Sequence, residues 1–424
     1  MPGTLELASP ETDALRQQLS ELFAPMMQTL HSKAGAQFNV EILAEDKVQD
    51  FIGAHAKVLD SAFERTAMSD RMRQRLQQSD YIFSGIKTFH ELNEVFPSLV
   101  DESGNRKPFE QFLNDVRKID ETYNKNYLRA EYNFVQSSAE MAGKWEQIEQ
   151  DGDRYNLQYR TAGDSKVRPE HAALNGVTLP PSDPFWQTYY PPNGWNCRCT
   201  VVQVRKTKYP ATPHDEAMQR GAQATGKDTK GIFQFNAGME QKTFPDYNPY
   251  TIKRCRDCDI AKGKLNLARP LDNELCDACK LVHMIERRRV NETVSRSRNR
   301  EAQKNLTNWY KKSLPEVKLG KFTAKRLCVT DSEGVEIVFN KTFYNEVINK
   351  YQDDPLYPLK LEYARRAHEI IKQSRLTNPS EDSVDHPDSI FRVYEYDDDC
   401  YLIEMKVKCN ADGNIMRYLR VYKK

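Results

Sequence analysis

The sequence predicts a multidomain α+β protein, and three observations lead to that prediction. The chain has 424 residues, which is enough for two to four domains. Its first part has a helical pattern with little proline or glycine, and its last part has strand-like segments next to helices. A cysteine-rich segment lies between them. We therefore expect a mainly α N-terminal domain, a zinc-knuckle segment and a small α+β C-terminal domain with an antiparallel sheet.

Charge and hydropathy limit the function and the location of the chain. It carries 62 Lys and Arg against 61 Asp and Glu, so any basic surface for nucleic acid must be local. The N-terminus lacks the basic start and apolar run of a signal peptide, and no stretch approaches the roughly 18 apolar residues of a membrane span. We therefore expect no membrane partner and a reducing cytosol, where nine cysteines are better explained by metal or burial than by disulfides.

Hydrophobic periodicity and turn residues predict the N-terminal elements. Residues 1–35 are expected to form a polar tail with one helix, and residues 36–210 one domain that begins with a long helical region. Asp151-Gly152 can end the last of these helices, and residues 155–161 alternate as a strand does. The stretch that follows is rich in proline, glycine and aromatic residues, which indicates a compact, irregular unit. One helical face, expected in the core, carries Leu128, Tyr132, Val135 and Ala139.

Residues 211–300 are predicted to be a connector that holds four cysteines and a basic, helical linker. Residues 205–250 look extended and polar, with few side chains for a core. Two C-x2-C pairs follow, with 17 residues between them, and each pair can wrap a tight turn that aims two thiolates at one point. This spacing predicts a closed structural zinc site that the segment needs in order to fold. The predicted ligands are Cys255, Cys258, Cys276 and Cys279.

Three alternatives to this zinc site remain open. The pairs could be redox-active, although such a pair normally sits at a helix N-terminus in a βαβ unit, and nothing here resembles that. They could also form a disulfide pair. His283 lies four residues after Cys279 and could replace one cysteine as a ligand, although we expect a solvated or capping histidine there.

A second set of metal-ligating residues lies upstream. His171, Cys197 and Cys199 could form a three-ligand site, but two thiols on alternate residues of a strand face opposite sides unless the segment turns. In the alternative interpretation, Arg168 pairs with an acid, His171 caps a loop and the cysteines are small buried hydrophobic residues. Both interpretations stay open from the residues alone.

The same region carries an ordered series of residues. They are Asp164, Arg168, His171, Gly176, Asp183, Pro191-Pro192, Asn196, Cys197, Arg198 and Cys199. In order and spacing the series resembles the motif of the phage Mu-type (Mu F-like) head morphogenesis proteins, which are minor head (minor capsid) proteins of phages and prophages. The resemblance covers roughly residues 50–250, including the stretch from Phe233 to Tyr250.

This resemblance implies a function, a location and partners. Such a protein contacts the portal and other head proteins and acts in capsid assembly or alongside packaged DNA. It is present in the bacterial cytoplasm during assembly and then in the virion head. The resemblance also implies metal chelation by His171, Cys197 and Cys199, and it implies no catalytic reaction for this region.

Residues 301–424 are predicted to form the α+β domain. Strand-like segments cover residues 333–341, 390–396, 400–409 and 415–424, and Asp412-Gly413 indicates a two-residue hairpin turn. That turn predicts the pairs Lys408 with Arg417 and Lys406 with Leu419. The face with Tyr401, Ile403, Met405, Val407 and Cys409 is then expected in the core, as are Cys328 and Cys400.

The helices followed by an antiparallel sheet resemble the barnase, colicin and RelE-like nuclease folds in architecture. The resemblance implies metal-independent RNA cleavage, with His368 as the acid-base group and Lys406, Lys408 and Arg417 holding the phosphate. His386 is the other candidate histidine. The alternatives are an ordinary helix histidine and a solvated sheet face.

Three functions remain open at this point. The first is a minor head protein with a fused nuclease-like domain. The second is a ribonuclease toxin delivered by a phage-head module, and the third is a non-catalytic, zinc-containing protein that binds nucleic acid.

Overall fold

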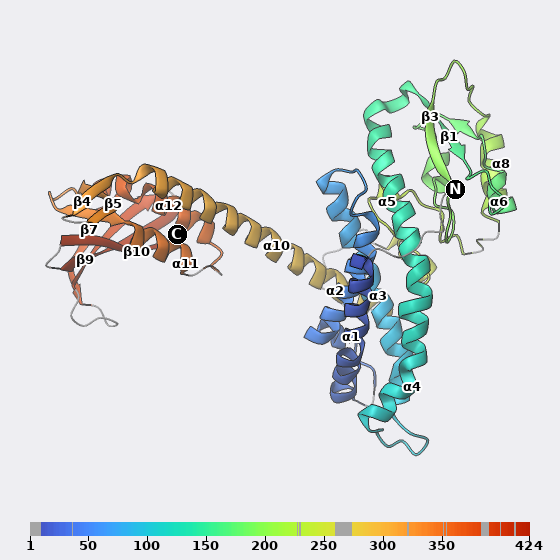
Figure 1. Cartoon of the computed structure of the whole chain (residues 1–424), viewed down its shortest axis with the longest axis horizontal. Coiled ribbons are helices and arrows are strands. Elements are labelled where there is room, and N and C mark those ends of the chain that lie inside the picture. Colours follow the sequence, from blue (N-terminus) through green and yellow to red (C-terminus); the bar gives the residue numbers. More distant parts are fainter. Residues whose placement is uncertain are drawn as a thin grey trace. The chain divides into compact units, whose positions relative to one another are not determined.

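The computed structural model describes residues 10–35, 37–226, 228, 230–258, 274–319, 322–350, 352, 354–382, 390–398, 400–410 and 413–424. The chain divides into two compact units, Met1–Arg288 and Arg289–Lys424. The sequence analysis expected four parts, with boundaries near residues 35, 210 and 300. Figure 1 shows a mainly helical first unit and a second unit with a sheet, so the multidomain α+β prediction is confirmed.

Five long helices form the scaffold of the first unit. Ser69 begins one of them by accepting a hydrogen bond from the Met72 N–H at 3.1 Å, and Gly152 ends another with φ 54°. A π-helical turn, Thr122–Tyr127, joins the last two. The helices are α1 (Pro10–Lys33), α2 (Asp46–Asp60), α3 (Asp70–Val95), α4 (Phe109–Glu121) and α5 (Leu128–Asp151), with 3₁₀ turns at Val40–Ala44, Ser61–Phe63, Phe96–Leu99 and Gly152–Arg154.

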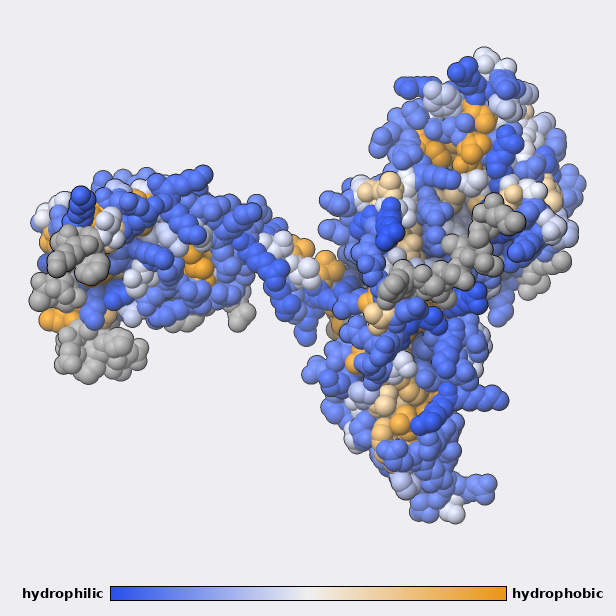
Figure 2. Space-filling view, viewed as in Figure 1, coloured by the Kyte–Doolittle hydropathy of each residue, from blue (hydrophilic) through white to orange (hydrophobic). Residues whose placement is uncertain are grey.

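The core of this scaffold includes the first helix. Leu19, Met26 and Met27 of α1 are almost fully buried with apolar residues of α2 to α5, so α1 is part of the scaffold core and not a free tail. The predicted core positions Leu128, Val135 and Ala139 are buried too, and Tyr132 packs against them half-buried. The face drawn in Figure 2 is mostly hydrophilic, and only small areas are apolar.

A small irregular domain follows α5. Its sheet has the order β2-β1-β3 with antiparallel pairs, and the predicted strand at 155–161 corresponds to β1. Trp186, Tyr159 and Tyr190 fill its separate core. Its elements are β1 (Asn156–Arg160), α6 (Pro169–Ala172), β2 (Thr178–Leu179), α7 (Phe185–Tyr189), β3 (Thr200–Val204) and α8 (His214–Ala224).

The segment predicted as an extended connector at 205–250 is more structured than expected. It contains α8 and α9 (Ala237–Glu240), and it buries Phe235, Phe244 and Tyr250 in the core of the helical scaffold. Gly238 lies so close to α5 that a Cβ atom there would be 2.2 Å from Cβ of Trp145. The prediction failed because these apolar residues are spaced irregularly, so no periodic pattern marks them.

A charged network lies in the middle of the scaffold. The Lys87 ammonium donates to the Glu131 carboxylate at 2.6 Å and to Nε2 of His55 at 3.0 Å, and all three side chains are at most 3% exposed. The Tyr250 hydroxyl donates to the other Glu131 oxygen at 2.8 Å. Ser84 donates to a backbone carbonyl, so it accepts from Nδ1–H of His55 and fixes the neutral tautomer. Burial, and next the charge of Lys87, lowers the pKa of His55 to about 4.

The second unit consists of the later part of a long helix, two shorter helices and a seven-stranded sheet. The sheet order is β4-β5-β6-β10-β9-β8-β7, in which β6 and β10 are parallel and the other pairs antiparallel. The predicted basic linker is helical and belongs to α10. The elements are α10 (Glu274–Ser313), β4 (Glu316–Leu319), β5 (Phe322–Thr330), β6 (Glu336–Asn340), α11 (Lys341–Asn349), α12 (Tyr357–Ile370), β7 (Arg375–Asp382), β8 (Ile390–Asp398), β9 (Tyr401–Asn410) and β10 (Gly413–Lys423). Among the described helices of the chain, none is long and apolar enough to cross a membrane.

The predicted register of the last hairpin is wrong, although its core face is right. Gly413 pairs with Asn410, and Lys408 faces Ile415 where Arg417 was expected. A bulge between Met416 and Tyr418 then shifts the register again, so Lys406 faces Tyr418. Ile403, Met405 and Val407 are fully buried as predicted, whereas Cys328 and Cys400 are exposed and Cys409 is half-buried.

Replacing Glu131 with glutamine should destabilise the first unit strongly. It leaves the buried ammonium of Lys87 without a counter-charge, which costs about 3–5 kcal/mol. Urea unfolding of the full chain measures this loss. Asp50→Asn is the control, because it breaks the exposed Lys47–Asp50 pair (N···O 3.2 Å) and should cost under about 1 kcal/mol. Equal losses in the two variants would contradict the structural role of the network.

The neighbouring Glu91 predicts a pH dependence. Burial raises its pKa to about 8, so the folded state keeps a proton that the unfolded state releases above its ordinary pKa. The stability that this proton contributes to the folded state is complete below pH 4 and is lost as pH rises through 8. The stability advantage of Glu91→Gln over wild type should therefore grow between pH 5 and 8, by at most about 1.4 kcal/mol per pH unit. The exposed Glu102→Gln variant should show no such trend, and an advantage that shrinks with pH would refute the assignment.

Candidate functional site

Local backbone geometry brings His171, Cys197 and Cys199 together. Proline at the first position of α6 starts that short helix, and His171 lies within it, 5% exposed. The peptide bond between Pro191 and Pro192 is cis, and the N–H of Cys197 closes a turn onto the Gly194 carbonyl at 3.1 Å. Asn196 has φ 57°, a left-handed conformation that asparagine tolerates well. This turn lets both thiols of the C-x-C pair approach the same imidazole.

The distances between the three side chains fit metal coordination. Nδ1 of His171 lies 3.7 Å from Sγ of Cys197 and 3.9 Å from Sγ of Cys199. In the part of the chain that the structure describes, these residues form the one group of three His, Cys, Asp or Glu side chains whose ligand atoms lie within 4.8 Å of one another. Imidazole and thiolate are the donors that zinc prefers, so the group fits a zinc ion with three protein ligands.

The electrostatics of the two thiols are unequal. A hydrogen bond from Cys199 lowers the pKa of Cys197 well below its usual range, and His171 adds to this effect although burial opposes it. The same interaction with Cys197, together with burial, raises the pKa of Cys199. Cys197 therefore loses its proton more readily than Cys199, and a zinc ion bound by both sulfurs would displace the protons that remain.

A cavity of about 230 Å³ adjoins the three ligands, and its wall is cationic. Arg168 donates to the Trp195 carbonyl, and this packing requires glycine at position 194, because a Cβ there would lie 2.8 Å from Nη1 of Arg168. Arg198 binds Asp164 through two hydrogen bonds of 2.6 and 2.7 Å, which lower the pKa of Asp164 to about 2. The three-ligand group therefore adjoins an accessible space, as a metal site with an open position does.

The remaining motif residues have structural roles. Gly176 adopts φ 81°, and its N–H donates to the Tyr159 carbonyl at 2.9 Å. Asp183 accepts from the Phe185 N–H at 2.9 Å and contacts Nδ1 of His214 at 3.0 Å, so it caps α7 and ties it to α8. Tyr159, which the sequence analysis did not single out, donates to Asn193 at 2.8 Å beside the two thiols. The one sequence signal for Tyr159 was its position on the inward face of the predicted strand at 155–161.

The four predicted zinc ligands meet in a different part of the first unit. Cys255 and Cys258 belong to the 3₁₀ turn Lys253–Asp257 and its C-cap, and Cys276 and Cys279 to the first turns of α10. All four line one cavity of about 70 Å³ that His283 also lines. Burial, followed by the charges of the other three cysteines, raises the pKa of Cys279 to about 12. The two cysteine pairs line the same cavity, but their sulfur atoms are less closely grouped than the ligand atoms of His171, Cys197 and Cys199.

The residues suggested for RNA cleavage lie on different faces of the second unit. His368 of α12 packs in the core beside Trp309 and Phe339, at ring distances of 5.3 and 6.4 Å. Lys406 and Lys408 alternate along β9 with the buried core residues, so they lie on the other face of the sheet. Arg417 sits in the bulge of β10, with Nη1 3.9 Å from Glu346 of α11. The structure does not gather these four residues into one site, and His386 lies outside the described residues.

The first unit thus combines a helical scaffold with a compact loop domain that holds a buried His/Cys/Cys group. Comparison with known proteins finds similarity in this part of the chain. Residues 102–202 match the family described as Phage Mu protein F like protein. The expected resemblance is confirmed there, and the matched range contains the whole motif from Asp164 to Cys199.

Two relatives share this part of the chain. The putative capsid assembly protein F of Escherichia phage Mu is 41% identical over 104 residues, which cover 24% of this chain and 21% of the relative. The Mu-like prophage FluMu F protein of Haemophilus influenzae is 35% identical over 91 residues, which cover 20% of this chain and 22% of the relative. The chain thus matches about a fifth of the length of these relatives. No solved structure gives a significant match.

Replacing Cys197 with serine should remove one metal equivalent from the full chain. Serine is a poor zinc ligand, and two remaining donors do not hold zinc tightly. Native mass spectrometry after zinc loading measures the change. Cys328→Ser, at an exposed cysteine of the second unit, should keep the wild-type stoichiometry. Unchanged zinc content in Cys197→Ser would show that the three residues form a metal-free buried cluster.

Proposed function

We propose that this chain is a minor head protein of a phage or prophage, which acts in capsid assembly and contacts the portal and other head proteins. The observation that carries the proposal is the family match over residues 102–202, which contains the His171, Cys197 and Cys199 group. A relative with the same segment is called a capsid assembly protein. The chain would be made in the bacterial cytoplasm and then carried in the virion head.

The packing of the motif supports a binding role for this module. Its function in such a protein would be to hold one loop surface in a fixed shape, and zinc at the His/Cys/Cys group would cross-link α6 to the Trp195–Cys199 turn. Both segments also carry the cationic residues of the adjoining cavity, Arg168 and Arg198. An acidic segment of a head protein is the partner chemistry that this surface fits.

A genetic test in the phage or prophage that encodes the chain can decide this proposal. The double variant Cys197→Ser, Cys199→Ser should lower the titre of infectious particles at least a hundredfold, and the variant protein should be missing from purified heads. The double variant Cys328→Ser, Cys400→Ser changes two exposed cysteines and should leave the titre unchanged. Normal titre in a deletion of the whole gene would refute the head function.

A second role for residues 301–424 has one observation in its favour. Arg289–Lys424 forms its own compact unit, outside the segment that matches the head-protein family. A fused nuclease-like domain, or a ribonuclease toxin delivered by the head module, would occupy such a unit. The separation of His368 from Lys406 and Lys408 argues against that catalytic set, so an active enzyme would have to use other residues. Induced expression of residues 289–424 in bacteria, followed by RNA electrophoresis, tests the idea, and intact RNA with normal growth would refute it.

Nucleic-acid binding without catalysis is the remaining alternative. The linker part of α10 is rich in arginine, and Arg288, Arg298 and Arg300 in it are exposed. Binding through such residues would weaken steeply as salt rises from 50 to 200 mM. Binding that is absent, or that does not depend on salt, would exclude this alternative.

A further inference from the structure

The four cysteines of the two C-x2-C pairs lie at a junction of three chain segments. The helix α3 forms one wall of their cavity with Ile82, Phe83 and Ile86. The segment from Lys242 to Thr251 forms a second wall, and the first turns of α10 form the third with Leu275 and His283. These segments are far apart in the sequence. They also lie outside residues 102–202, so the family match does not account for this cluster.

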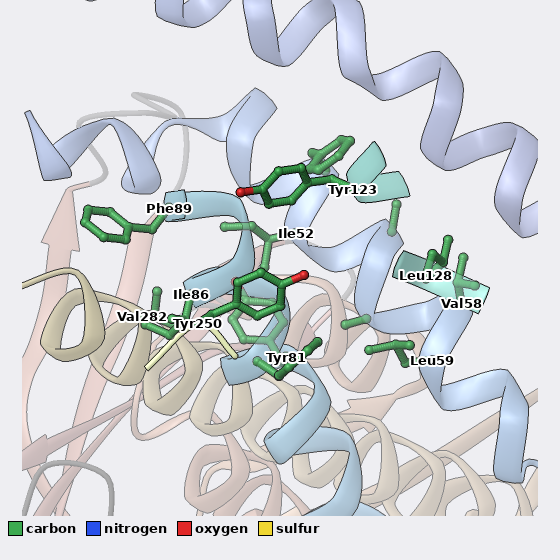
Figure 3. Close-up of a cluster of buried hydrophobic side chains, with 14 of the residues drawn as sticks. Ile52, Val58, Leu59, Tyr81, Ile86, Phe89, Tyr123, Leu128, Tyr250 and Val282 are labelled. Carbon is green, nitrogen blue, oxygen red and sulfur yellow. The ribbon is translucent and has the colours of Figure 1, made fainter. Parts of the chain in front are cut away.

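The helices at this junction approach each other very closely. Gly85 of α3 faces Val282 of α10, and a Cβ at position 85 would lie 2.7 Å from Cγ1 of Val282. Val282 is 1% exposed and Ala278 is fully buried in the scaffold core. Figure 3 shows Val282 beside Ile86, with Tyr250 of the second segment nearby. The start of α10 is therefore packed into the scaffold at a fixed position.

The middle segment is held by aromatic contacts. Phe244 stacks on Phe83 with ring centroids 3.6 Å apart, and Tyr250 meets the same ring edge-on at 5.4 Å. The Thr243 hydroxyl donates to Asp80 of α3. This leaves the polypeptide beyond Tyr250 close to α3, where Cys255 and Cys258 face the cysteines of α10 across the cavity.

We propose that Cys255, Cys258, Cys276 and Cys279 bind one structural zinc ion as four thiolates, and that this zinc fastens the first turns of α10 to the turn Lys253–Asp257, beside α3. The spacing of the pairs, their convergence on one cavity and their position at the junction carry the proposal. Zinc would release the protons of the thiols that are protonated in the metal-free chain.

The surroundings of the cavity suit such an ion better than a disulfide. Four cysteines line the cavity together, and so does the Lys242 ammonium with its ion-pair partner Asp246. The apolar side chains of Phe83, Phe244 and Leu275 keep water from the sulfurs. Four thiolates complete a tetrahedron, so His283 is left outside the coordination sphere.

The mechanical consequence concerns α10. The zinc would cross-link residues on both sides of residues 259–273, and it would fix the first turns of the helix whose last turns bury Leu306 and Tyr310 in the core of the second unit. One metal site would thus hold the N-terminal end of α10, the helix that the two units share. It is independent of the head function, because no head protein takes part in it.

Two measurements on the full chain test the proposal. In a Cys197→Ser, Cys199→Ser background, which removes the other metal group, native mass spectrometry should show one zinc. That zinc should be lost when Cys255, Cys258, Cys276 or Cys279 becomes serine. It should be kept in the matched controls Cys328→Ser and Cys400→Ser, and in His283→Asn. Loss of zinc in His283→Asn, with retention in any one of the four cysteine variants, would overturn the four-thiolate assignment.

Hydrogen exchange tests the fastening. Removing zinc with a chelator, or replacing Cys276 with serine, should raise exchange at least tenfold in residues 274–288 and 243–258 and leave β8 and β9 of the second unit unchanged. If zinc removal leaves the hydrogen-exchange protection of residues 274–288 unchanged, the proposed fastening of α10 is refuted. If a cysteine variant fails to fold, cobalt loading of the Cys197→Ser, Cys199→Ser protein tests the four-thiolate site instead. A tetrahedral spectrum with sulfur-to-cobalt bands of four thiolates supports the proposal, and a spectrum without them refutes it.

Discussion

Helix α5 is the element on which the two cores of the first unit depend. Its first half buries Leu128, Phe134 and Val135 in the helical scaffold, and its second half buries Met141, Trp145 and Ile148 in the loop domain. Trp145 meets Tyr190 edge-on at 5.0 Å, and Tyr190 donates to the Met141 carbonyl at 3.1 Å. One rigid helix therefore fixes where the loop domain with the His171, Cys197 and Cys199 group sits on the scaffold, because both cores share its side chains.

The buried charges explain why this scaffold accepts a single arrangement. Lys87 needs the carboxylate of Glu131, and Glu131 in turn needs the hydroxyl of Tyr250, which comes from the distant segment after α9. A shift of any of these elements would leave a charge unpaired in an apolar interior, at a cost of several kcal/mol. The network is poor as a source of net stability, but it makes competing packings of α3, α5 and the 242–251 segment unfavourable. The same segment then leads directly into Cys255 and Cys258, the first two cysteines of the proposed four-thiolate zinc site.

The sequence predicted elements and motifs better than it predicted partners in space. The helices, the strand β1 and the core face of β9 follow from local periodicity, which the residues Val135, Ala139, Met405 and Val407 display directly. The hairpin register failed by two residues at the turn because Gly413 was taken as a loop position, and the bulge at Arg417 has no periodic signal. The Lys87 network was invisible since His55 and Glu131 lie 32 and 44 residues from Lys87, and each alone looks like a surface residue. For the His171 group, residue types were predictable, but its geometry depends on the left-handed Asn196, which no pattern revealed.

The two cysteine groups differ in what their coordination would permit. Three ligands beside a cavity of about 230 Å³ leave one zinc position open to a water molecule or to a group from a partner. Four thiolates in a cavity of about 70 Å³, walled by aromatic side chains, leave none. The position of each group agrees with this difference. The open group lies in the segment shared with the head-protein family, between cationic residues that a partner can reach, whereas the closed group lies where α3 and α10 are already in contact. A chain that binds zinc at both groups, as proposed, would use one ion for recognition and the other only to hold its helices, and a partner would exchange ligands at the first without disturbing the second.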